Sequence, residues 1–166
     1  MHNIIPSLLD RFLKEDIPAL AFDDSLKNSV RRDLQSLLNA RTFDSLEKQV
    51  SDFDEVITST VNYGTKDYSG MANGKVSMAD VADMVHQAII NFEPRIIPES
   101  LQVVPSSSSG DPTQGLAQLT KKELTNIMKK GSFDFVVRGA ICSDPTPLEF
   151  QFKTALNVAD GDFKLT

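Results

Sequence analysis

The chain contains no tryptophan, two tyrosines, two histidines and one cysteine in 166 residues. The absence of tryptophan and the small number of tyrosines argue against an aromatic ligand cage or stacking platform. The single cysteine, Cys142, excludes an internal disulfide framework and is typical of a reducing compartment. Its neighbours predict a thiol buried in a strand. His2 and His86 are too few for a histidine-based metal site, and neither a metal nor another cofactor is expected.

Basic residues are also fewer than acidic ones: the chain has 17 basic and 23 acidic residues, and a net charge of −6. An acidic chain has no electrostatic reason to bind nucleic acid or anionic membranes. No stretch approaches the ~18 uninterrupted apolar residues of a membrane span, and no signal peptide is visible. These features predict a cytoplasmic protein without direct membrane insertion, and the length suits a single domain over residues 1–166.

Two stretches have strong helical periodicity. Residues 25–41 place five apolar side chains on one face, at steps of three and four. Residues 77–92 repeat this pattern behind a capping pair, Ser77 and Asp80. The second helix must end near residue 92, because Pro94 disfavours helical dihedrals before it and has no N–H to donate. Arg31 and Arg32 fall outside the apolar face of the first helix, where they are solvated or meet an acidic partner.

Weaker patterns suggest two further helices, at residues 7–14 and 116–130. The second of these follows a Ser/Gly-rich stretch, so residues 106–131 are interpreted as an insertion. A strand-like run over residues 101–104 precedes it. We expect the insertion to be peripheral.

The last third of the chain predicts antiparallel strands. Apolar and polar residues alternate over residues 133–141 and 148–156, and a short strand follows at 163–165. We therefore predict an α+β fold, with N-terminal helices packed on a C-terminal antiparallel sheet and a helical insertion between the first two strands. An edge strand so close to the C-terminus predicts free backbone groups, to which another chain could add a strand.

The sequence lacks the usual catalytic motifs. It has no nucleophile elbow, no paired cysteines, no His-Glu-x-x-His and no glycine-rich nucleotide loop. Two acids for glycoside hydrolysis can always be chosen from the 23 acidic residues of the chain. Glu93 with Asp67 is the pair to test, because both lie in non-helical stretches. No aromatic sugar platform supports that choice, so the residues predict a protein that is not an enzyme.

The triplet Glu93-Pro94-Arg95 separates the helical part of the chain from the strands. The simplest interpretation is a helix stop with two solvated charges. The alternative interpretation is a docking site, in which the proline holds the Glu93 carboxylate and the Arg95 guanidinium outward for a partner.

Several motifs occur together in one order: residues 29–41 (SVRRDLQSLLNAR), 59–64 (STVNYG) with 67–70 (DYSG), and 90–95 (INFEPR). Together with the C-terminal hairpin at 160–163 they resemble TssE, the baseplate subunit of type VI secretion systems. TssE is similar to a phage T4 baseplate wedge protein of the group named "lysozyme-like". The motifs hold six residues that this resemblance marks as structural: Arg31, Arg32, Asn62, Tyr63, Gly64 and Gly70.

The resemblance implies a structural baseplate protein in which Glu93, Pro94 and Arg95 bind partners. It implies contacts with the wedge subunits TssF, TssG and TssK, and with the sheath proteins TssB and TssC. Strand addition from sheath to baseplate is implied as well, in a baseplate docked at the membrane. The alternative is a peptidoglycan-cleaving enzyme, as the group's name suggests.

Overall fold

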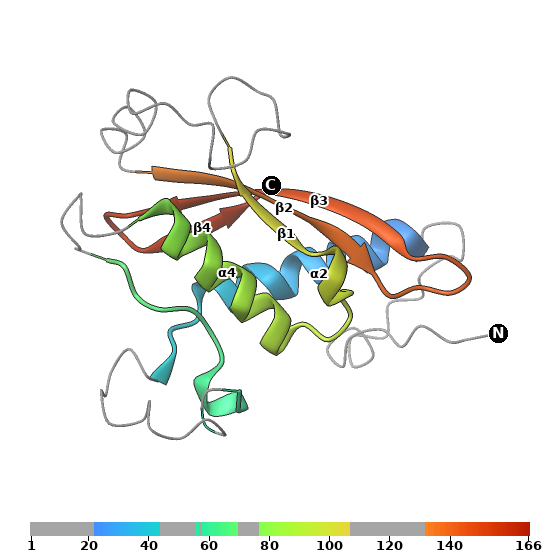
Figure 1. Cartoon of the computed structure of the whole chain (residues 1–166), viewed down its shortest axis with the longest axis horizontal. Helices are drawn as coiled ribbons and strands as arrows, with labels where there is room; N and C mark the ends of the chain where they lie inside the picture. The colour runs from blue at the N-terminus through green and yellow to red at the C-terminus, as the bar shows by residue number, and fades with distance from the viewer. Residues whose placement is uncertain (1–21, 44–55, 57, 70–76, 107–131) are drawn as a thin grey trace.

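The structure is a computed structural model that describes residues 22–43, 56, 58–69, 77–106 and 132–166. It has two layers, in which helices α2 (Phe22–Asn39) and α4 (Met78–Phe92) cover one face of a four-stranded sheet (Figure 1). Two short 3₁₀ turns, η4 (Thr60–Asn62) and η5 (Pro98–Ser100), lie in the connections. The α+β fold, with N-terminal helices on a C-terminal antiparallel sheet, is confirmed.

Both strong helices are present, with shifted ends. Ser77 caps α4, and its hydroxyl accepts from the Ala79 N–H at 3.2 Å. The helix ends at Phe92, as the position of Pro94 predicts. α2 begins earlier than expected and ends before residue 41. Asp23 and Asp24 lie in its first turn, where negative charge favours a helix N-terminus.

The sheet contains β1 (Gln102–Pro105), β2 (Ser132–Ile141), β3 (Leu148–Asn157) and β4 (Asp162–Leu165). All neighbouring strands are antiparallel, and the spatial order is β1-β2-β3-β4. Phe133 pairs with Leu156 in the register, and Leu156 pairs with Phe163. Because paired residues share a face, the alternating apolar side chains of the strands form one surface under the helices.

The core lies between this surface and the two helices. Burying a large apolar side chain contributes roughly 1.5–3 kcal/mol, so this layer carries most of the stability. Its most deeply buried members are Val30, Leu34, Leu37, Leu38, Val81, Val85, Ile89, Phe135, Val137, Ile141, Leu156 and Phe163.

Two expectations about the sheet are wrong. Cys142 is exposed, because β2 ends one residue before it. The outer edge of β4 is not free, because α2 side chains bind its backbone. The expected helices at residues 7–14 and 116–130 lie outside the described part of the chain.

Candidate functional site

The Glu93-Pro94-Arg95 triplet forms a closed ion pair where α4 ends. The Glu93 backbone N–H still donates to the Ile89 carbonyl, and the Glu93 side chain then turns inward until only 6% of the residue is exposed. Arg95 binds both carboxylate oxygens, from Nε to Oε1 at 2.7 Å and from Nη2 to Oε2 at 2.6 Å. A guanidinium and a carboxylate match each other in this bidentate geometry, so the ion pair has a fixed orientation as well as a strong attraction.

Helix α2 supplies the other partners of Arg95. Nη2 donates to Asp33 Oδ2 at 2.6 Å, and Nη1 donates to Ser29 Oγ at 3.3 Å. These contacts join residues more than 60 positions apart in the chain. The pKa of Arg95 is raised above its ordinary value, chiefly by the hydrogen bonds to Glu93, although burial acts in the opposite direction. We define Ser29, Asp33, Glu93 and Arg95 as the Arg95 cluster.

Tyr63 closes one side of the Arg95 cluster. Its ring meets the Phe92 ring edge-on, with centroids 5.4 Å apart. Burial raises the pKa of the Tyr63 hydroxyl, and the negative charges of Asp33 and Glu93 raise it further. The phenol therefore stays neutral beside two carboxylates.

Backbone hydrogen bonds fix the triplet to the end of β2. The Cys142 N–H donates to the Arg95 carbonyl at 2.7 Å, and the Ile97 N–H donates to the Ala140 carbonyl at 2.9 Å. The expectation that the proline holds both charges outward is therefore wrong. Glu93 faces inward, most of the guanidinium is engaged within the chain, and Pro94 is the exposed residue of the three.

The predicted motif residues around Gly64 hold the C-terminal end of α2. Gly64 has φ of 134°, and the Thr65 N–H that follows donates to the Ala40 carbonyl at 2.9 Å. The Thr65 hydroxyl donates to the Leu38 carbonyl, also at 2.9 Å. These bonds satisfy carbonyls that a helix end leaves without partners. Asn62 is buried in the same turn, whereas Gly70 lies outside the described residues.

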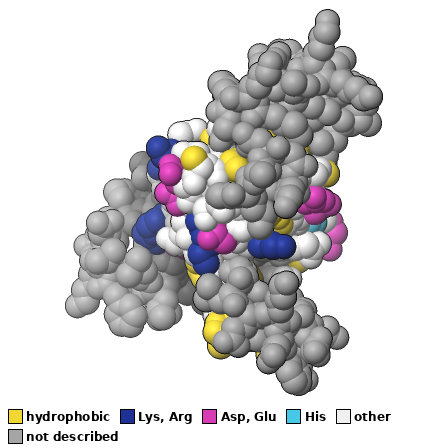
Figure 2. Space-filling view, turned by 90° about the vertical axis from the view of Figure 1, so that its left-hand side faces the viewer, with side chains coloured by type: hydrophobic (Ala, Val, Ile, Leu, Met, Phe, Trp, Pro, Cys, Tyr) yellow, Lys and Arg dark blue, Asp and Glu magenta, His cyan; other side chains and the backbone are white. Residues whose placement is uncertain are grey.

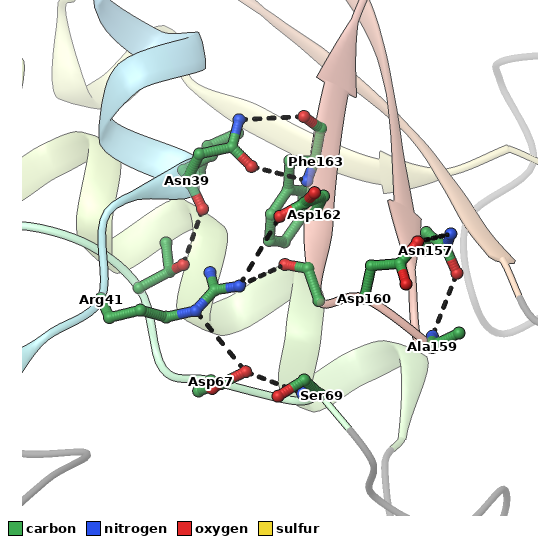
Figure 3. A network of polar contacts seen from close by, with 12 residues as sticks. Asn39, Arg41, Asp67, Ser69, Asn157, Ala159, Asp160, Asp162 and Phe163 are labelled. Atoms are coloured by element: carbon green, nitrogen blue, oxygen red, sulfur yellow. Dashed lines mark hydrogen bonds and ion pairs between the residues drawn. The ribbon is translucent and has the colours of Figure 1, made fainter.

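A second polar cluster lies just beyond that end of α2, on Arg41 (Figure 3). Arg41 Nη2 donates to the Gly161 carbonyl at 3.0 Å, and Arg41 Nε lies 3.5 Å from Asp67 Oδ1. Asp162 is a looser partner at 3.9 Å. The Arg41 Nη1 atom is buried and has no hydrogen-bond partner within the described residues. We define Arg41, Asp67, Gly161 and Asp162 as the Arg41 cluster.

One face of the molecule carries both signs of charge. Lysine and arginine side chains lie among aspartates and glutamates over the described part of the face in Figure 2. Arg31 and Arg32 are exposed on α2, and Arg32 Nε lies 3.4 Å from Asp33 Oδ1.

The sequence indicates where the motifs lie but not how their residues pair. The local patterns around Ser29, Asp33 and Arg41 do not indicate which distant residues they bind. The available signal was that Arg41 and Asp67 both fall inside the resembling motifs. In the structure, α2 carries one cluster along its length and the other just past its end, so it joins motifs that lie far apart in the sequence.

The acid pair considered for glycoside hydrolysis is divided between the two clusters. Arg95 binds both oxygens of Glu93, and Asp67 accepts from the Ser69 N–H at 2.8 Å beside Arg41. Within the described ranges, no group of three or more acidic, histidine or cysteine side chains is placed to hold a metal ion. None of the described helices has the length and apolar character needed to cross a membrane.

Asp67 gives a testable pH dependence. Hydrogen bonds from the Ser69 backbone and side chain lower its pKa below 3.8, and Arg41 lowers it further. A carboxylate with a depressed pKa in the folded state contributes stability above its unfolded pKa, and loses it as pH falls through the folded value. In Asp67→Asn, we therefore expect less loss of stability than in the wild type when urea unfolding is compared at pH 5 and pH 3. Asp160→Asn is the matched control, and equal losses in Asp67→Asn and the wild type would contradict the assignment.

Comparison with known proteins supports the resemblance. The sequence profile of a family described as "Baseplate wedge protein gp25" matches residues 24–120, which is more than half of the chain. Neither the curated proteins nor the solved structures gave a match. The matched region includes Asp33, Arg41, Tyr63 and the whole Glu93-Pro94-Arg95 triplet, although Gly161 and Asp162 lie beyond it. The chain belongs to the gp25 family of baseplate wedge proteins, of which TssE is the type VI secretion homologue.

Proposed function

We propose that this protein is the wedge subunit of a type VI secretion baseplate, which links the TssF–TssG wedge to the contractile sheath and seeds sheath assembly. Its family is one of structural baseplate components. The observation that carries the proposal is the Arg95 cluster, because it makes one rigid unit of α2, the end of α4 and the end of β2.

The partner-binding role of the triplet follows from what the cluster leaves on the surface. Pro94 is exposed, and the Arg95 side chain keeps 22% of its accessible surface. Glu93 acts through Arg95, because its carboxylate fixes the direction of the guanidinium. In this proposal, TssF, TssG and TssK bind around Pro94 and Arg95, while TssB and TssC contact the sheet in a cytoplasmic baseplate docked at the membrane.

Co-purification with TssF and TssG tests the proposal. We expect wedge binding to weaken at least tenfold in Arg95→Lys and Glu93→Gln, because either change removes the bidentate contact while keeping a side chain of similar size. Circular dichroism at low temperature establishes that each variant is folded. His86→Ala, on the helix that ends just before the triplet, is the control and should bind as the wild type does.

Sheath assembly in cells is the measurement that can contradict the proposal. If Glu93→Ala and Arg95→Ala both support normal sheath formation, the triplet has no role in assembly. Release of muropeptides from cell-wall sacculi by the purified wild type, and its loss in Glu93→Gln, would instead favour the peptidoglycan-cleaving alternative.

A further inference from the structure

The sheet carries a hollow of about 420 Å³ that none of the contacts described above uses. Among its lining residues are Ser106, Asp134, Lys153, Ala155, Lys164 and Thr166. The three charged residues of this set alternate along their strands with buried residues, so their side chains point away from α2 and α4. The hollow therefore lies on the face of the sheet opposite to these helices, and we name it the Lys153 hollow.

The register of the strands explains why the surface is hollowed here. Asp134 pairs with Ala155, and Ala155 pairs with Lys164, so the three residues form one row across β2, β3 and β4. Ala155 has only a methyl group, and the row is therefore low at its centre between two longer side chains. Lys153, two residues earlier on β3, shares this face and lies diagonally opposite Lys164.

The charges around the hollow are not neutralised by the chain itself. In the part of the chain that the structure describes, the side chains of Asp134, Lys153 and Lys164 make no ion pair or hydrogen bond. Both lysines are exposed, whereas Asp134 is half-buried. Two cations against one acid make the hollow locally positive in a chain whose net charge is −6. Its complement is therefore an anionic group.

The positions of the two lysines favour an anion with a particular spacing. Diagonal neighbours on one face of an antiparallel pair lie about 7–8 Å apart. Alternate residues of an extended segment point to the same side and are separated by about 6.6 Å, twice the rise per residue. An extended segment with acidic residues at alternate positions thus presents one carboxylate to each ammonium group. Asp134 is placed to accept an N–H from the same segment.

Other occupants fit this lining less well. Residues 107–131, which follow Ser106, contain four lysines and two acids, so their charge does not complement the hollow. A second copy of the chain carries the same net charge of −6, which opposes association. A single inorganic anion lacks the second carboxylate needed to engage both lysines at this spacing.

We propose that the Lys153 hollow binds an extended acidic segment of a partner protein, with acidic residues at alternate positions. The segment lies across the face of the sheet and is held by side chains, so it adds no strand to either edge. The hollow has the size of typical ligand sites, which are about 300–1,000 Å³, and holds a few residues of such a segment.

Nuclear magnetic resonance titration with a blocked peptide, GESESESG, tests the proposal. We expect the peptide to shift the amide signals of Lys153, Ala155 and Lys164, and the glutamine peptide GQSQSQSG to leave them unchanged. The double variant Lys153→Glu with Lys164→Glu should bind GESESESG at least tenfold more weakly. Lys66→Glu is the matched control, because it reverses the charge of an exposed lysine outside the hollow and should bind as the wild type does.

Ala155→Leu separates the hollow from its charges. It keeps both lysines but fills the floor between them, and we expect it to weaken binding of GESESESG at least fivefold while the remaining amide signals show an intact fold. Equal binding of the glutamate and glutamine peptides, or equal affinity in the double lysine variant and Lys66→Glu, would overturn the proposal. Sodium phosphate that shifts the same amides with the affinity of the peptide would reduce the hollow to a general anion site. Amide shifts that depend on protein concentration without peptide would assign it to a second copy, and either result would overturn the inference.

Discussion

Arg95→Ala is expected to lower the free energy of unfolding by about 3–5 kcal/mol, because it leaves the buried Glu93 carboxylate without its partner. Glu93 is 6% exposed, and both of its side-chain oxygens are bound by Arg95. The variant also removes the contact to Asp33, which connects α2 to the end of α4. Equilibrium unfolding in urea, followed by circular dichroism, measures the loss.

Arg32→Ala is the matched control for Arg95→Ala. Arg32 also contacts Asp33, at 3.4 Å, but its side chain is 42% exposed. Exposed ion pairs contribute about 0–1 kcal/mol, so this change should be small. In the double variant Glu93→Ala with Arg95→Ala, the loss should be smaller than the sum of the two single losses, since the residues interact directly. Equal unfolding midpoints for Arg95→Ala and Arg32→Ala would show that the Arg95 cluster does not stabilise the fold.

The elements of this fold follow closely from local patterns in the sequence. Helix α4 is defined by Ser77 at one end, by Pro94 beyond the other and by apolar spacing between them. The strands follow from alternation, since one face of the sheet packs on α2 and α4. The same spacing predicts α2 but not its first turn, because the apolar pattern begins only at Leu26.

The polar contacts between elements could not be predicted in the same way. Asp33 and Arg95 are 62 positions apart, and Asn39 and Phe163 are 124 apart. A charged or amide side chain on a helix surface has the same local pattern whether it is solvated or bound to a distant strand. Only the packing of α2 on the sheet brings Gln35 and Asn39 to the β4 edge, so alternation alone predicted a free edge there. The inward turn of Glu93 depends on the same packing.

The turn that ends at Gly64 shows how one backbone position supports both clusters. Its left-handed φ brings Thr65 against the last carbonyls of α2, and the Arg41–Thr65 bridge follows directly. Tyr63, one residue earlier, lies against Phe92 beside the Arg95 cluster. Asp67, three residues later, belongs to the Arg41 cluster. A displacement of the Gly64 backbone is therefore expected to disturb both the Arg95 cluster and the Arg41 cluster.

Gly64→Ala is expected to cost about 3 kcal/mol or more. A side chain at this positive φ is strained, which alone costs of order 1–3 kcal/mol. The added Cβ would also lie 2.5 Å from the Ala40 carbonyl oxygen, and that backbone cannot move without losing the Thr65 hydrogen bonds. Urea unfolding gives the total, and tyrosine fluorescence gives the local change, since the chain has no tryptophan and its two tyrosines are Tyr63 and Tyr68.

Gly139→Ala separates this backbone effect from the general cost of adding a methyl group to the interior. Gly139 lies in β2, and a Cβ there would be 3.3 Å from the Phe150 ring, a side chain that can shift by a few tenths of an ångström. We expect its cost to stay below about 1.5 kcal/mol, within the range of tolerated core changes. The fluorescence of Tyr63 and Tyr68 should change in Gly64→Ala and stay as in the wild type in Gly139→Ala. If the two alanine variants lose the same stability, the close approach of Gly64 to Ala40 does not hold the end of α2, and the two clusters are not joined through this turn.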